Sequence, residues 1–232
     1  MSESPARVWI AHLDRLPLEA CGTWLDESEQ RRLLRFACPR ERCRRCAAWS
    51  LRRHALSQAR PEIQPEAWRF TQDGAGKPEL GQPFAGLGLS HNLSHGGAYV
   101  AVMVARGPCG VDVEAPTQEL AALSEVLTPA EERDVRLSAQ PADRFLLHWT
   151  AKEAALKLLG TGFLTPPQTL KLSIAEDEGS ATVRRSMTSS PPLPAGLQLS
   201  LWALPEGYRL AAACTLADSA PRPFLSEWSA AA

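Results

Sequence analysis

The chain contains no apolar run that approaches the length of a membrane span. Its first residues, Met1–Arg7, lack the basic and apolar regions of a secretory signal peptide. Its formal net charge is −1 at pH 7, so no overall charge attracts nucleic acid or a membrane surface. Together with an ordinary 44% share of hydrophobic residues, these absences predict a cytoplasmic globular protein that binds neither nucleic acid nor membrane.

Cysteines are few, and they do not form a convincing metal motif. Cys38, Cys43 and Cys46 have the spacing of a plant-type iron–sulfur loop. The arginine and alanine residues around them predict a helix rather than a loop, which argues against a cluster. We therefore expect the six cysteines of the chain to be free and reduced.

Charge is unevenly distributed along this near-neutral chain. Residues 29–60 hold ten arginines against two glutamates, and residues 112–134 hold seven acidic residues against one arginine. A basic and an acidic segment together suit a site for a polyphosphate and a metal ion. They equally suit two helices with solvated charged faces, which is the commoner role of charge runs.

Residues 145–162 form the most informative stretch and predict a helix. Strong helix formers dominate it, and Gly160 and Gly162 follow its last apolar pair as a helix stop. Trp149, Glu153 and Lys157 recur every four residues, so they lie along one stripe of that helix. The simplest explanation is a surface ion pair between Glu153 and Lys157. A functional site is the alternative.

Residues 110–114, Gly-Val-Asp-Val-Glu, favour the functional alternative. The alternation of valine and acid predicts a strand with Asp112 and Glu114 on the same face. Two neighbouring carboxylates repel each other unless a cation lies between them. A small number of oxygen ligands suits Mg²⁺, and Glu153 would add a third carboxylate. The alternative is an exposed edge strand with an acidic outer face.

These two motifs, in this order, resemble those of the 4′-phosphopantetheinyl transferases of the surfactin-synthetase-activating type. Such enzymes move phosphopantetheine from coenzyme A to a serine of an apo acyl or peptidyl carrier protein. The resemblance implies that Asp112, Glu114 and Glu153 bind Mg²⁺. It also implies that Glu153 is the base for the serine hydroxyl and that Lys157 stabilises the leaving 3′,5′-ADP.

The resemblance further implies residues for the phosphates of coenzyme A. Residues 92–96, Asn-Leu-Ser-His-Gly, are similar to the family's Asn-Ile-Ser-His-Ser and make Ser94 and His95 candidates. Gly76-Lys77-Pro78 matches the family's Gly-Lys-Pro and adds Lys77. Arg32 and Arg44, which lie nearer the N-terminus, match positions at which the family has a basic residue. The chain departs from the family pattern at Glu29, where one member has a lysine.

The fold expected from the sequence is α/β (α+β), with two similar subdomains. Residues 49–56 and 149–156 resemble each other, which predicts a pseudo-twofold pair, each half a small, mostly antiparallel sheet packed with a long helix. We expect subdomains at 1–108 and 109–218, a site at their interface, and a loosely held tail from 219 to 232. An internal repeat also suggests a monomer.

The strands are expected at 8–11, 68–71, 87–93, 99–105, 169–174, 181–185, 197–203 and 208–216, and the other helices at 25–35, 40–60 and from Thr128. Ser94–Gly97 is expected to connect two strands. A carrier protein is expected to dock on an apolar, mobile face near Glu131.

Two other functions remain open at this point. One is another Mg²⁺-dependent phosphoryl or nucleotidyl transferase, which would consume ATP and ignore coenzyme A. The other is a non-catalytic module that binds carrier proteins. The presence of all three carboxylates and Lys157 favours an enzyme.

Overall fold

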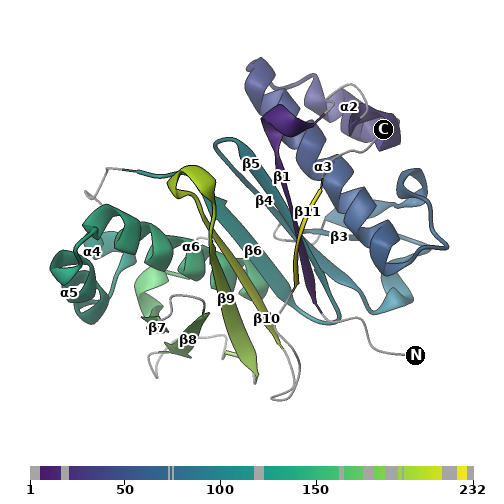
Figure 1. The fold of residues 1–232 in the computed structure, drawn as a ribbon. Coiled ribbons are helices and arrows are strands. Elements are labelled where there is room, and N and C mark those ends of the chain that lie inside the picture. The colour runs from purple at the N-terminus through teal and green to yellow at the C-terminus, as the bar shows by residue number, and fades with distance from the viewer. Residues whose placement is uncertain are drawn as a thin grey trace. The chain divides into compact units, whose positions relative to one another are not determined.

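A computed structural model describes residues 6–16, 21–72, 74, 76–117, 123–161, 165–174, 180–185, 193–194, 196–215 and 224–228 of the chain. The chain divides into two compact units (Figure 1). Unit 1 comprises residues 1–107 and 223–232, and unit 2 comprises residues 108–222. Among the helices in the described ranges, none is long and apolar enough to cross a membrane.

Unit 1 is built on a four-stranded sheet in the order β11-β1-β5-β4. Its strands are β1 (Arg7–His12), β4 (Ser90–Gly96), β5 (Tyr99–Ala105) and β11 (Phe224–Glu227). The pairs β1/β5 and β4/β5 are antiparallel, and β1/β11 is parallel. A small second sheet pairs β2 (Phe70–Gln72) with β3 (Pro78–Leu80).

Among the described residues, the α-helices of unit 1 are α2 (Glu27–Leu33) and the longer α3 (Pro39–Ala59). Asp26 caps α2 in a capping box with Glu29, and Pro39 occupies the first position of α3, where its missing N–H has no cost. The apolar face of α3 (Ala47, Ala48, Leu51, Ala55 and Leu56) is fully buried in one core with Val100 and Val102 of β5. Figure 1 shows α3 lying against this sheet.

Unit 2 is built on a five-stranded antiparallel sheet in the order β6-β10-β9-β8-β7. Its strands are β6 (Cys109–Glu114), β7 (Leu170–Ile174), β8 (Ser180–Arg185), β9 (Leu197–Ala203) and β10 (Arg209–Thr215). Its helices are α4 (Leu123–Val126), α5 (Pro129–Leu137) and α6 (Pro141–Leu159). α6 lies along the sheet face, where its alanines and leucines form a core with β7, β9 and β10 (Figure 1).

The prediction of a mixed α and β fold is confirmed. Each unit combines a largely antiparallel sheet with one long helix. α6 ends as predicted at Gly160, which adopts φ 68°, a left-handed conformation that glycine reaches without strain. It begins earlier than the motif suggested, because Pro141 provides a favourable first residue. The pseudo-twofold relation, and a site where the two halves meet, stay predictions.

Two expectations are corrected. Ser94 and His95 do not form a connection but lie within β4, and the turn to β5 is made at Gly97, which has φ 53°. The C-terminal segment is not a loose tail throughout, because β11 pairs with β1 and Trp228 is buried in the core of unit 1. An aromatic side chain buried at this depth stabilises the segment that carries it. Most of residues 186–194, a stretch rich in serine and proline in which the sequence predicts a loop, falls outside the described residues.

Candidate active site

β6 and α6 approach each other unusually closely at Gly110. A Cβ atom at this position would lie 2.1 Å from the backbone oxygen of Ala154 and 2.5 Å from the backbone nitrogen of Leu158. Only glycine therefore allows this contact between a strand and a helix backbone. The consequence is that the residues that follow Gly110 on β6 lie directly beside α6.

The two carboxylates of β6 bind side chains of α6. The Lys157 ammonium donates to Asp112 Oδ1 at 2.6 Å, and the Trp149 indole N–H donates to Glu114 Oε1 at 3.1 Å. Asp112 is buried, with 3% of its surface exposed, and Glu114 is half-buried. The two carboxylates and the stripe of α6 therefore face each other.

This arrangement answers the two simpler explanations. Lys157 forms an ion pair with Asp112 on the neighbouring strand, so it is not merely part of a surface pair within its own helix. β6 is indeed an edge strand of its sheet, but α6 covers its acidic face and Asp112 is not exposed. Burial of a carboxylate costs free energy unless a partner compensates its charge. A buried, paired carboxylate is therefore more typical of a functional site than of a solvated surface.

The site carries excess negative charge. Burial, with a further contribution from the charge of Asp112, raises the pKa of Glu114 to about 7. The same two causes raise the pKa of Glu153, which lies one turn before Lys157 on α6. In the part of the chain that the structure describes, the Lys157 ammonium group acts on all three carboxylates, and an additional cation would relieve their repulsion.

The chemistry of these donors fits Mg²⁺, which prefers carboxylate oxygens and retains several waters. Among the residues that the structure describes, however, no three His, Cys, Asp or Glu side chains already converge as a metal site. The ammonium group of Lys157 lies against Asp112 at 2.6 Å, where a cation is needed. The three carboxylates are therefore chemically suitable ligands for Mg²⁺. To bind the metal together, they would have to come closer to one another, and Asp112 would have to bind Mg²⁺ as well as Lys157.

Unit 1 holds the residues predicted to bind phosphates. Arg44 on α3 forms an ion pair with Glu41 at 3.1 Å, and His95 Nε2 on β4 lies 3.9 Å from another oxygen of that carboxylate. Burial lowers the pKa of His95, although Glu41 opposes the shift. The structure therefore brings Arg44 and His95 together around Glu41. Ser94, the residue before His95, is buried in β4.

The other two candidates of unit 1 lie on different elements. Arg32 is exposed on α2, with its guanidinium 5.0 Å from the centre of the Trp49 ring. Lys77 lines a cavity of about 390 Å³ together with His91, whose imidazole is buried. Among the described residues, these contacts do not join all five phosphate candidates in a single cluster.

Glu29, where the chain departs from the family pattern, has a structural role. Its carboxylate accepts hydrogen bonds from Arg52 at 2.6 Å and Arg53 at 3.0 Å, and it is buried. It also closes the capping box of α2 by accepting from the Asp26 backbone N–H. Glu29 thus fixes α2 to α3 rather than binding an anion.

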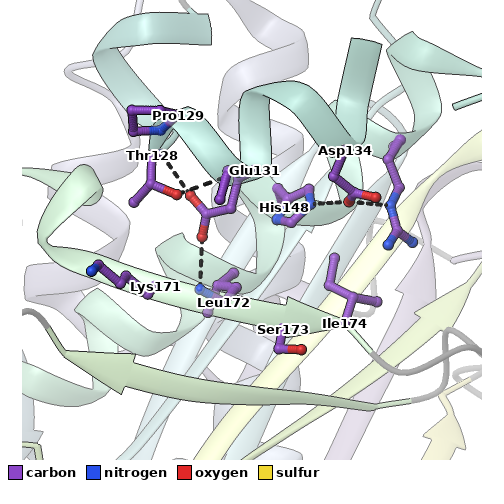
Figure 2. A pocket seen from close by; sticks show the side chains of 11 residues that line it. Thr128, Pro129, Glu131, Asp134, His148, Lys171, Leu172, Ser173 and Ile174 are labelled. Atoms are coloured by element: carbon purple, nitrogen blue, oxygen red, sulfur yellow. Dashed lines mark hydrogen bonds and ion pairs between the residues drawn. The ribbon is translucent and has the colours of Figure 1, made fainter. Parts of the chain in front are cut away.

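Glu131, near which a carrier-docking face was expected, is not itself exposed, and the docking face stays a prediction. Glu131 is buried and accepts hydrogen bonds from the backbone N–H groups of Thr128 and Leu172, both at 2.7 Å (Figure 2). It also forms an ion pair at 2.7 Å with the buried Lys152. A capping glutamate that reaches the edge of β7 therefore fixes α5 against the sheet.

A cavity of about 500 Å³ lies beside this cluster in unit 2 (Figure 2). On its wall, Asp134 accepts hydrogen bonds from Arg144 and from His148 Nε2, each at 2.8 Å. Burial lowers the pKa of His148, and Asp134 opposes the shift. These contacts join α5 to the first half of α6, and none involves the three candidate carboxylates.

Comparison with known proteins places the chain in a family. A family model described as the 4′-phosphopantetheinyl transferase superfamily matches residues 108–213, which contain both motifs. The chain is similar to 4′-phosphopantetheinyl transferase HetI from Nostoc sp., with 32% identity over 71% of this chain and 78% of the relative. It is 35% identical to 4′-phosphopantetheinyl transferase psf-1 from Bacillus pumilus, over 50% of this chain and 49% of the relative.

A eukaryotic relative is also similar. The L-aminoadipate-semialdehyde dehydrogenase-phosphopantetheinyl transferase of Schizosaccharomyces pombe is 28% identical over 71% of this chain and 72% of the relative. The matches agree with the motifs on β6 and α6 and with the mixed α and β fold. The chain therefore belongs to the 4′-phosphopantetheinyl transferase superfamily.

Proposed function

We propose that this enzyme transfers 4′-phosphopantetheine from coenzyme A to a serine hydroxyl of an apo acyl or peptidyl carrier protein. In this reaction the serine oxygen bonds to the phosphorus that carries pantetheine. The bond from that phosphorus to the bridging pyrophosphate oxygen breaks, and its electron pair leaves with 3′,5′-ADP. The observation that carries the proposal is the set of carboxylates on β6 and α6 next to Lys157.

Glu153 is the proposed base. It is half-buried, and burial and the charge of Asp112 raise its pKa, so it accepts a proton more readily than an exposed glutamate does. Asp112, Glu114 and Glu153 would hold Mg²⁺. When bound, Mg²⁺ supplies a positive charge that neutralises the pyrophosphate and its growing charge. Lys157 is the proposed cation for the leaving group, because its ammonium group is already held beside Asp112.

The proposed coenzyme A ligands are Arg32, Arg44, Lys77, Ser94 and His95. Their residue types suit the 3′-phosphate and the pyrophosphate, which are anions. Glu41 pairs with Arg44 and also lies 2.7 Å from Arg45, so an incoming phosphate has to compete with this carboxylate. We also propose that the enzyme is of the surfactin-synthetase-activating type and acts as a monomer.

The choice of co-substrate tests the proposal against its nearest rival. The full chain is incubated with Mg²⁺, an apo carrier protein and an equimolar mixture of coenzyme A and ATP. We expect 3′,5′-ADP to accumulate and ATP to remain unchanged. Consumption of ATP with coenzyme A left intact would replace the proposal with another phosphoryl or nucleotidyl transferase. Binding of the carrier without consumption of either would indicate a non-catalytic module.

The Trp149→Phe variant tests the hydrogen bond to Glu114. Phenylalanine keeps an aromatic ring but removes the indole N–H that donates to Glu114 at 3.1 Å. We expect the Mg²⁺ concentration for half-maximal activity to rise about tenfold, as is typical when a partner of a metal ligand is lost. The measurement is initial rate against Mg²⁺ concentration. An unchanged Mg²⁺ dependence would mean that Trp149 serves packing only.

A further inference from the structure

The Arg209–Asp143 ion pair lies beside the proposed metal-binding carboxylates and has no role in the reaction described above. Arg209 begins β10, and its guanidinium donates through Nε to Asp143 Oδ1 at 2.8 Å and through a second nitrogen to Asp143 Oδ2. Asp143 belongs to the first turn of α6. The Arg209 side chain is 14% exposed, so this is a largely enclosed, two-pronged contact.

The strand register makes this pairing unexpected. In the antiparallel β6/β10 pair, Arg209 lies directly opposite Glu114. Its neighbour on the other side, on β9, is Ala203. Directly opposite residues share one face of the sheet with their Cβ atoms about 5 Å apart, so an arginine and a glutamate there normally attract each other. Glu114 is therefore the natural partner of Arg209 within the sheet.

The structure instead gives each of the two residues a partner from α6. Glu114 accepts from the neutral indole of Trp149, and Arg209 is bound by Asp143. A neutral donor orients the Glu114 carboxylate without cancelling its charge, whereas a guanidinium would cancel it. The guanidinium of Arg209 is thus bound by Asp143 rather than by Glu114, the residue opposite it.

We propose that Asp143 is a positioning residue that sequesters Arg209 and so keeps Glu114 available to bind a divalent cation. The inference rests on the proposed function, in which Glu114 is a Mg²⁺ ligand. A guanidinium on Glu114 would compete with Mg²⁺ for the same oxygens. Partners of metal ligands influence metal affinity in this way without touching the metal.

The Asp143→Asn variant is a conservative test. The amide has the size of the carboxylate but no charge, so it no longer holds Arg209 against the attraction of Glu114. Asp143 lines a cavity of about 360 Å³ with Pro116, Leu146 and Gly207, so the change crowds no neighbour. We expect the dissociation constant for Mg²⁺ to rise about tenfold. It is measured by calorimetric titration of Mg²⁺ into the full chain, with and without saturating coenzyme A.

The double variant Asp143→Asn with Arg209→Gln separates sequestration from simple support of α6. It lacks the ion pair, as Asp143→Asn does, but it also lacks the guanidinium that competes for Glu114. We expect its Mg²⁺ dissociation constant to return to the wild-type value, and Arg209→Gln alone to bind Mg²⁺ as the wild type does. Thermal unfolding of each variant shows whether the fold is retained.

Three results would overturn the inference. Asp143→Asn could bind Mg²⁺ as tightly as the wild type, or the double variant could bind it as weakly as Asp143→Asn. Either result would leave the proposed function standing, provided that the wild type transfers phosphopantetheine in a Mg²⁺-dependent reaction. Failure of the wild-type chain itself to bind Mg²⁺ would remove the metal role of Glu114 and the inference together.

Discussion

Changing Glu153 to Gln is expected to lower the turnover number for phosphopantetheinyl transfer by at least about a hundredfold, because the amide cannot accept the proton of the attacking serine. The fold should persist, since the side chain keeps its size. The loss of a charge that is half-buried near Asp112 should leave the free energy of unfolding unchanged or raise it. Turnover is measured by the release of 3′,5′-ADP, and folding by circular dichroism and thermal unfolding.

Glu132→Gln provides the matched control for this variant. Glu132 lies on α5 of the same unit, is partly buried and pairs with Arg136 one turn later. Its change to an amide removes a similar charge outside the candidate site, so turnover should stay near the wild-type value. Turnover of the Glu153→Gln variant at the level of this control would show that another group takes the proton.

The Gly110→Ala variant is expected to destabilise unit 2 severely. The added methyl group would lie 2.1 Å from the backbone oxygen of Ala154, and neither the strand nor the helix backbone can yield without losing its hydrogen bonds. We expect a loss of more than about 4 kcal/mol in the free energy of unfolding, at the extreme of single substitutions. Urea denaturation followed by circular dichroism measures this loss.

Gly86→Ala is the control for the effect of adding a methyl group. A Cβ atom at Gly86 meets no heavy atom within 4 Å, and its φ is not in the left-handed region. The variant should therefore unfold at nearly the wild-type urea concentration. If Gly110→Ala were as stable as this control, α6 would have to lie farther from β6 than the structure places it. The contacts of Asp112 and Glu114 with α6 would then differ from those described above.

The elements of the candidate site were predictable because local signals determine them. The alternation around Asp112 and Glu114 predicts one face of a strand, and the four-residue spacing of Glu153 and Lys157 predicts one stripe of a helix. The helix stop at Gly160 is equally local. The sequence also contains Gly110, but its significance requires knowing that α6 passes over it, which only the tertiary structure reveals.

Contacts that depend on strand register were not predictable. No spacing in the sequence indicates that Arg209 lies opposite Glu114 or that Asp143 binds Arg209. No local signal in the acidic segment predicts the environment of Glu131, near which a docking face was expected. Glu131 is in fact buried by its hydrogen bond to the β7 backbone. Long-range pairing, rather than local propensity, decides such positions.

The ends of elements were the other source of error. Ser94 and His95 precede two glycines, which favours a turn, but cross-strand pairing to Ala101 and Val100 continues β4 through both residues. Likewise, the polar and proline-containing C-terminal segment suggests a tail, whereas β11 adds to the free edge of β1 and Trp228 enters the core. In each case a partner strand supplies backbone hydrogen bonds that the local sequence does not predict.

The proposed function is tested most directly by the intact mass of an apo carrier protein after incubation with the full chain, Mg²⁺ and coenzyme A. We expect a gain of one phosphopantetheine group on the carrier and the loss of that gain when Mg²⁺ is chelated. No gain on acyl and peptidyl carrier proteins alike, with coenzyme A left intact, would contradict the proposed function.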